Sequence, residues 1–131
     1  MLAQGADPSR PYARFCRGAA LAFALVALYT VVMKAPSGDI ERDWLHTLLH
    51  VVTGATAAYA GWIATDAARW FTLAILVAYG ALGVGGWFTD GLFLESAARI
   101  PLDVADNVFH LLLAGASGAV LARRAARARP A

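Results

Sequence analysis

The sequence predicts an all-α membrane protein with four transmembrane helices packed as an antiparallel bundle. Of its 131 residues, 60% are hydrophobic and only 15% are charged, and the mean hydropathy is +0.57. The apolar residues fall into four long blocks, which excludes a disordered chain, a collagenous chain and a disulfide scaffold. We therefore expect a single domain over residues 1–131 whose surroundings are a lipid bilayer. A pI near 9 does not by itself indicate a nucleic-acid partner, and we expect none.

Each apolar block is long enough to cross the hydrocarbon core of a membrane. A core about 30 Å thick requires roughly 20 apolar residues in a helix. Helices are expected because every backbone N–H and C=O must be satisfied internally in lipid, and the alternating strands of a barrel are not seen. The predicted spans are residues 15–34, 44–64, 70–89 and 103–122.

Capping and helix-breaking residues indicate where the spans begin. The first span follows an arginine-rich leader, and Asp43 and Asp66 precede the second and third spans. These carboxylates can accept hydrogen bonds from the free N–H groups of a first helical turn. Pro101 limits the fourth helix, which would be only about 22 Å long if it began at Val108. We therefore expect the fourth helix to begin near Asp103.

The basic residues are divided unequally between the two sides of the predicted bundle. Eight arginines fall on the side of the termini, and three basic residues fall on the other side. By the positive-inside rule both termini are cytoplasmic. Trp44 and Trp87 lie at the predicted outer ends and Trp62 and Trp70 at the inner ends, where aromatic belts form. An alanine-rich composition with ten arginines for one lysine suits a bacterial genome, so we expect the bacterial cytoplasmic (inner) membrane.

Small residues and an internal repeat indicate how the helices pack. Glycine, alanine and serine crowd all four spans, and such residues let helix backbones approach closely in lipid. The second and fourth spans can be aligned with either His46 or His50 over His110. Either alignment predicts two repeated helical hairpins related by an axis along the membrane normal. Tyr29, Tyr59 and Tyr79 lie well inside the spans, and we expect their hydroxyls to find partners within the bundle. 

The polar residues of the spans concentrate near the outer ends of the second and fourth helices. His46 and His50 are spaced i, i+4 and share one helix face, as do Asp106 and His110, with Asn107 next to Asp106. Ionisable residues within a span are costly unless they face the interior and pair. These five residues are therefore the candidate site, and the imidazoles are expected to converge across the two hairpins.

Three interpretations of this polar cluster compete. The favoured one is a structural hydrogen-bond network of Asp, Asn and His side chains at the outer ends of the hairpins. The second is a metal site in which His46, His50, His110 and Asp106 bind Zn²⁺ or a similar ion, although no His-Glu-x-x-His motif is present. The third is a haem with imidazole axial ligands, which needs a gap that the small residues argue against. No cofactor is favoured, and a metal ion or haem is the alternative.

Two motifs resemble an uncharacterised family of small four-span bacterial membrane proteins, known only as a domain of unknown function. Residues 46–54 resemble its His-Asn-x-x-His-x-x-x-Gly stretch, and residues 105–110 resemble its Ala-Asp-Asn-x-x-His stretch. Thr47 stands where the family has Asn, and Ala114 where a Gly usually follows the last histidine. The resemblance covers residues 44–122. It implies four helices, a bacterial inner membrane and a role for the five polar residues, but no reaction.

Signatures of catalysis are missing from the sequence. It contains no Gly-x-Ser-x-Gly stretch, no phosphate-binding glycine pattern and no pair of acids deep in the membrane. Its single cysteine, Cys16, excludes an intrachain disulfide and is expected to be a small apolar filler. We therefore predict a structural or accessory membrane protein, not an enzyme, that forms a homo-oligomer or joins a larger membrane protein complex. A metal- or haem-binding membrane protein is the alternative.

Overall fold

Four long helices make up the described part of the chain, which confirms the all-α prediction. The structure, a computed structural model, describes residues 7–34, 36, 40–89 and 104–128. The helices are α1 (Arg10–Lys34), α2 (Ile40–Ala58), α3 (Ala68–Thr89) and α5 (Val104–Arg127). After α2 the chain continues through a π-helical turn, η1 (Tyr59–Ile63), and a 3₁₀ turn, η2 (Thr65–Ala67), into α3. The cap expected at Asp43 lies outside the residues whose side chains are described, and Asp66 lies inside the turn η2, whose N-cap position is taken by Ala64.

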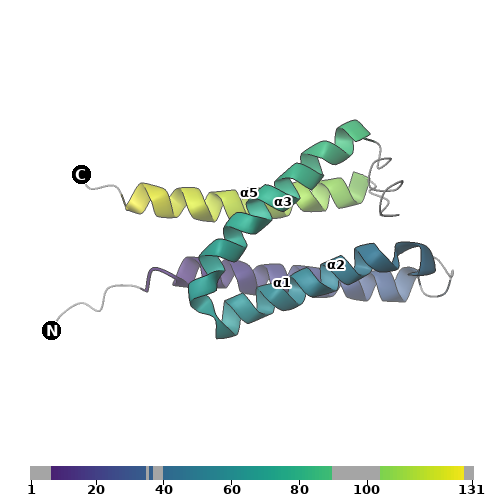
Figure 1. Cartoon of the computed structure of the whole chain (residues 1–131), viewed down its shortest axis with the longest axis horizontal. Helices are drawn as coiled ribbons and strands as arrows, with labels where there is room; N and C mark the ends of the chain where they lie inside the picture. Colours follow the sequence, from purple (N-terminus) through teal and green to yellow (C-terminus); the bar gives the residue numbers. More distant parts are fainter. Residues whose placement is uncertain (1–6, 35, 37–39, 90–103, 129–131) are drawn as a thin grey trace.

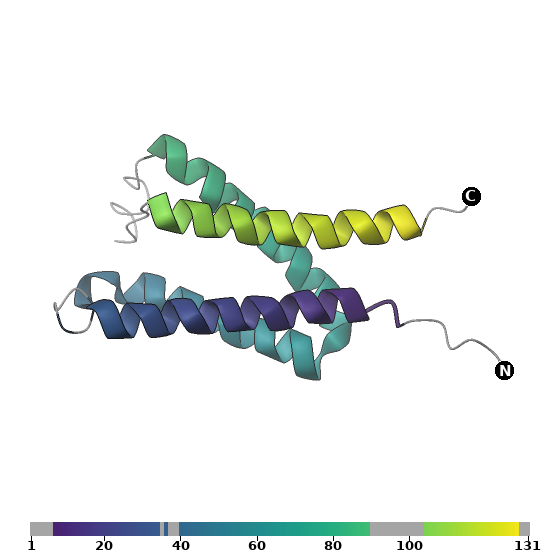
Figure 2. The same cartoon turned by 180° about the vertical axis from the view of Figure 1, so that it is seen from behind.

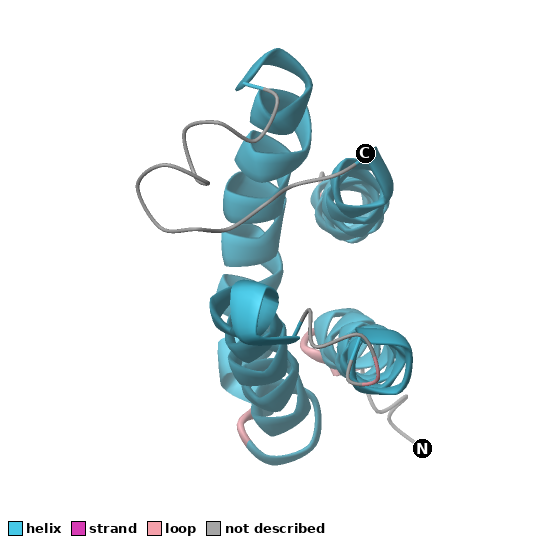
Figure 3. Ribbon diagram, turned by 90° about the vertical axis from the view of Figure 1, so that its right-hand side faces the viewer, coloured by secondary structure: helices cyan, strands magenta, loops and turns pink. Residues whose placement is uncertain are grey.

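The helices run antiparallel and pack mainly as two hairpins (Figure 1). α1 packs along α2, and α3 packs along α5, with α3 crossing the bundle obliquely (Figures 1 and 2). The end-on view shows α5, beside the C mark, next to α3, and α1 next to α2 (Figure 3). The start of α1 and the end of α5, the described parts nearest the two termini, lie at the same end of the bundle. The expected antiparallel bundle of two hairpins is therefore present.

Within the described residues, three helices are long and apolar enough to cross a membrane. They are Arg10–Met33, Thr65–Phe88 and Val104–Arg127. α2 is not in this set, because its 19 α-helical residues include three charged ones at positions 41–43, and the π-helical turn follows directly. Extended by η1, however, it runs beside α1 in the same bundle. A multi-pass membrane protein is thus supported by three helices, and the span predicted over residues 44–64 stays a prediction.

Glycines allow close helix approaches at the centre of the bundle. An added Cβ at Gly54 would lie 2.8 Å from the Cβ of Phe23, which joins α2 to α1. An added Cβ at Gly83 would lie 3.0 Å from the backbone nitrogen of Leu111, which joins α3 to α5. A Cβ at either position would force its neighbour to shift, so glycine lets the helices approach this closely at both contacts. The close packing predicted from the small residues is confirmed here.

Exposed tryptophans mark the two ends of the bundle. Trp44 and Trp87 lie toward the end remote from the termini, and Trp62 and Trp70 toward the end that carries them. All four side chains are exposed, as are many leucines and valines between them. Tryptophan favours the headgroup level, and apolar side chains favour the acyl region. The surface between the two tryptophan layers therefore suits a lipid bilayer.

Candidate functional site

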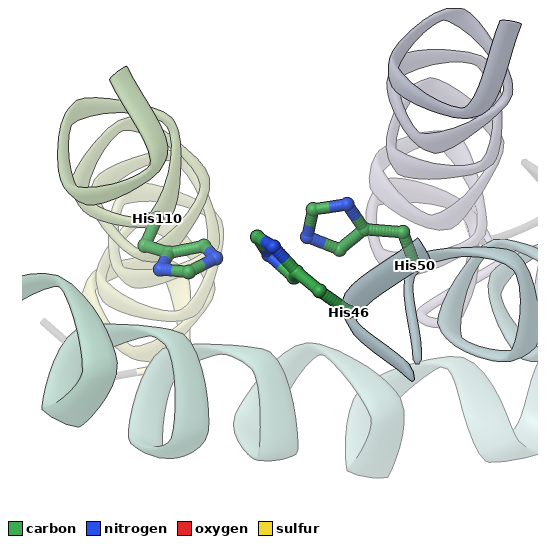
Figure 4. Close-up of side chains that lie close together, drawn as sticks. All are labelled: His46, His50 and His110. Carbon is green, nitrogen blue, oxygen red and sulfur yellow. The ribbon is translucent and has the colours of Figure 1, made fainter. Parts of the chain in front are cut away.

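Three histidines from two helices converge inside the bundle (Figure 4). His46 and His50 lie one turn apart on α2, and His110 points toward them from α5. Each offers one ring nitrogen, and these three nitrogens all lie within 4.8 Å of one another. The residues are only 7%, 4% and 2% exposed, respectively. The convergence expected across the two hairpins is present, and we call these three residues the histidine cluster.

Aromatic side chains enclose the histidine cluster. The ring centroid of Phe23 lies 5.5 Å from that of His50, and the ring of Phe109 lies 5.9 Å from it. The ring of Tyr79 lies 5.0 Å from that of His110 in an edge-on arrangement. Such walls exclude water and lower the local dielectric, which strengthens the interaction of an ion with its ligands.

The two other predicted site residues lie at the edge of the histidine cluster. The Oδ1 atom of Asp106 is 4.0 Å from the Nε2 atom of His46, and the Asp106 side chain is 27% exposed. Asn107 is buried and turned toward α3, where an added Cβ at Gly86 would collide with its amide. The structure therefore gathers the three imidazoles tightly, places Asp106 beside one of them and packs Asn107 against the neighbouring helix.

The space between the imidazoles fits a single metal ion. A Zn–N bond of about 2.0–2.1 Å in tetrahedral geometry puts neighbouring nitrogens about 3.4 Å apart. Nitrogens within 4.8 Å of one another therefore need to close by about 1.4 Å at most, which small side-chain rotations supply. A tetrapyrrole needs a flat slot between its axial ligands. The Tyr79 ring centroid lies 5.0 Å from that of His110, and the Phe23 and Phe109 ring centroids lie 5.5 and 5.9 Å from that of His50. These aromatic side chains fill the space beside the imidazoles that a tetrapyrrole would need.

The aromatic residues that enclose the histidine cluster were not predicted from the sequence. Phe23 comes from α1, which contributes none of the predicted site residues. The one feature of the sequence that relates to its position is Gly54, the small residue that it contacts on α2. Phe109 precedes His110 in α5, but its position in the sequence does not indicate which way its ring faces. Tyr79 was expected to find a hydroxyl partner, and it donates a hydrogen bond to Thr53 Oγ1 at 3.3 Å. Residue types that can bind a metal are recognisable in a sequence, whereas the aromatic residues that will surround them in the fold are not.

Comparison with known proteins places the chain in a family. Neither the curated proteins nor the solved structures contain a match. A family model matches residues 38–124, which is 87 of the 131 residues and includes the whole histidine cluster. The matched range leaves α1 outside. The chain belongs to the family described as a domain of unknown function (DUF4383).

Proposed function

We propose that this protein is an integral membrane protein that binds one transition-metal ion through His46, His50 and His110. The observation that carries the proposal is the convergence of three buried imidazole nitrogens within 4.8 Å. Neutral imidazole is the commonest metal ligand in proteins and suits zinc, copper, iron and nickel ions. A cation shared by three nitrogen lone pairs also offsets the cost of burying three polar rings together. Zn²⁺ is the probe of choice because it is redox-inactive and accepts three histidines in tetrahedral geometry.

Asp106 supplies negative charge beside this site. Its Oδ1 atom lies 4.0 Å from His46 Nε2, and its side chain reaches the rim of the bundle. A carboxylate in this position either enters the fourth coordination site or holds the imidazole ring in the orientation that the ion requires. The contact between Asp106 and His46, which was expected to belong to a structural hydrogen-bond network, is therefore also compatible with His46 as a metal ligand.

We assign the bound ion a structural role. His46 and His50 belong to the hairpin of α1 and α2, whereas His110 belongs to the hairpin of α3 and α5. An ion bound by all three would join the two hairpins at the end remote from the termini. The protein would thus be a structural or accessory membrane protein with a metal-stabilised bundle, and the proposal assigns it no reaction.

The accessory role includes association with itself or with a larger membrane protein complex. Among the described residues, no atom lies within 4 Å of a Cβ added at Gly18, so this outward position offers a neighbouring helix a close approach. The arginine distribution supports an orientation with both termini inside, and the arginine- and alanine-rich composition supports a bacterial cytoplasmic membrane. Native mass measurement tests the association, and a lone monomer at all concentrations would contradict it.

Metal binding is tested on the purified full chain in detergent, with Zn²⁺ alone as the probe. We expect wild type to retain one ion per chain after dialysis, measured by elemental analysis. The His46→Ala/His110→Ala variant should lose more than about 100-fold in affinity, since even outer partners of a ligand contribute about 10- to 100-fold. Thr47→Ala is the matched control, because Thr47 adjoins His46 without belonging to the histidine cluster. Equal Zn²⁺ retention by wild type and the double variant would contradict the proposal.

The structural role has a separate measurement. Zn²⁺ at 100 times its Kd should raise the free energy of unfolding of wild type by about 2.7 kcal/mol. The double variant should gain nothing, while His110→Cys, which keeps a zinc ligand at that position, should regain part of the effect. Tight Zn²⁺ binding without any gain in unfolding resistance would contradict the structural role and leave the binding site standing.

A further inference from the structure

A second candidate site lies at the opposite end of the bundle, where both termini are found. A cavity of about 740 Å³ is bounded there by the start of α1, the turn η2 with the start of α3, and the end of α5. This volume falls within the range of about 300–1,000 Å³ that is typical of ligand sites. None of the residues that line it belongs to the histidine cluster. The cavity is therefore separate from the proposed metal site.

The lining of this cavity is divided into a cationic layer and an apolar layer. On α3, Arg69, Leu73 and Leu76 are spaced i, i+4 and i+7 and so share one face. They span about 10 Å along the helix axis, at 1.5 Å per residue. On α5, Arg124 lies toward the end of the helix, and Leu121 lies almost one turn deeper. Both helices thus present an arginine at the mouth and leucine below it.

Neighbouring tryptophans indicate the depth of this arginine layer in a membrane. The guanidinium carbon of Arg69 lies 5.7 Å from the ring centroid of Trp70. On the α1 side, the guanidinium carbon of Arg17 lies 5.6 Å from the ring centroid of Trp62. Because tryptophan favours the headgroup level, the mouth lies where bilayer phosphates lie. The leucine layer then lies at the depth of the acyl chains.

The charges around the cavity favour a monoanionic occupant. Arg69 and Arg124 line it together with one carboxylate, that of Asp66. Three further arginines and Asp7 line an adjoining groove, which shares Ser9 and Thr65 with the cavity. We propose that the cavity binds an anionic phospholipid of the phosphatidylglycerol class. The two arginines hold its phosphodiester, and one acyl chain lies along the leucine layer.

The proposal is tested by lipid retention. The full chain is reconstituted into vesicles of phosphatidylethanolamine and phosphatidylglycerol, extracted into a mild detergent and analysed by native mass spectrometry. We expect one phosphatidylglycerol per chain in wild type. Arg69→Ala/Arg124→Ala should weaken retention about 30-fold, because each arginine at a membrane surface contributes about a fivefold factor. Arg123→Ala/Arg127→Ala, which removes the same charge from residues that do not line the cavity, should retain the lipid.

A second variant separates a lipid-filled cavity from a merely basic surface. Ala125 lines the cavity, so Ala125→Trp fills part of it while every arginine remains. Loss of the bound lipid in this variant supports the proposal. Unchanged retention in Ala125→Trp, equal losses in the two arginine double variants, or equal retention of phosphatidylethanolamine would each overturn it. A wild-type spectrum of lipid-free dimers would also overturn it, since a second copy of the chain would then be the occupant.

Discussion

Replacing Gly83 with alanine tests the close approach of α3 and α5, which positions His110. A Cβ at position 83 would lie 2.9 Å from Leu111 Cγ and 3.0 Å from the Leu111 backbone nitrogen. The tip of the leucine can rotate away, but the backbone nitrogen cannot, so the two helices must separate by a few tenths of an ångström. Because Leu111 directly follows His110 in α5, the same displacement shifts one of the proposed metal ligands.

The expected size of this effect follows from two opposing contributions. Overpacking a close contact costs about 1–3 kcal/mol. Replacing a helical glycine by alanine stabilises by about 0.5–1 kcal/mol through helix propensity. We therefore expect Gly83→Ala to lower the free energy of unfolding by about 0.5–2 kcal/mol. Gly115→Ala is the matched control, because within the described residues nothing lies within 4 Å of its added Cβ, and it should leave stability unchanged or raise it.

The single cysteine provides the assay. Cys16 is fully buried, and its Sγ atom lies 3.7 Å from the carbonyl oxygen of Ala68. A membrane-permeant maleimide should therefore modify it only when the bundle opens, and the labelling rate reports the open population. In a denaturing-detergent titration, Gly83→Ala should label about 2- to 30-fold faster than wild type at a given detergent fraction. Coincident labelling curves for Gly83→Ala and the Gly115→Ala control would refute the reasoning.

Three further predictions concern the core, the metal and the start of α1. Phe23→Ala should cost about 3–5 kcal/mol in unfolding free energy, because the ring is buried against aromatic rings of both hairpins; denaturing-detergent titration measures the loss. Lowering the pH from about 8 to about 5 should release bound Zn²⁺, because protons compete for imidazole lone pairs and free imidazole titrates near 6.5; a competing zinc dye measures the release. The Ser9 N–H and hydroxyl donate hydrogen bonds to Asp7 and lower the pKa of its carboxyl. Their contribution to the start of α1 is present above the unfolded-chain pKa and lost as the pH falls through the lowered one. Amide exchange in the first turn should accelerate there, and in Asp7→Ala already at neutral pH.

Local properties of the chain were predictable from the sequence. Helices in the membrane follow from apolar length, and the shared face of His46 and His50 follows from helical periodicity alone. Whether a side chain faces lipid or the interior of the assembled bundle is not determined by the local sequence. Tyr29 and Tyr59 were expected to point inward like Tyr79, but both side chains are exposed. Depth within a span therefore did not determine orientation, because each helix has faces directed to lipid and to protein at every level.

By itself, the sequence determined an α-helical membrane protein with histidines on two helices and glycines where backbones could approach. Only the tertiary structure decided that those histidines lie within reach of one ion, that Phe23 encloses them, and that a separate cavity opens at the other end. The reason is physical. Helix formation depends on hydrogen bonds four residues apart, whereas the distance from α2 to α5 depends on how α1 packs on α2 and α3 on α5. Contacts between residues distant in the sequence determine this packing.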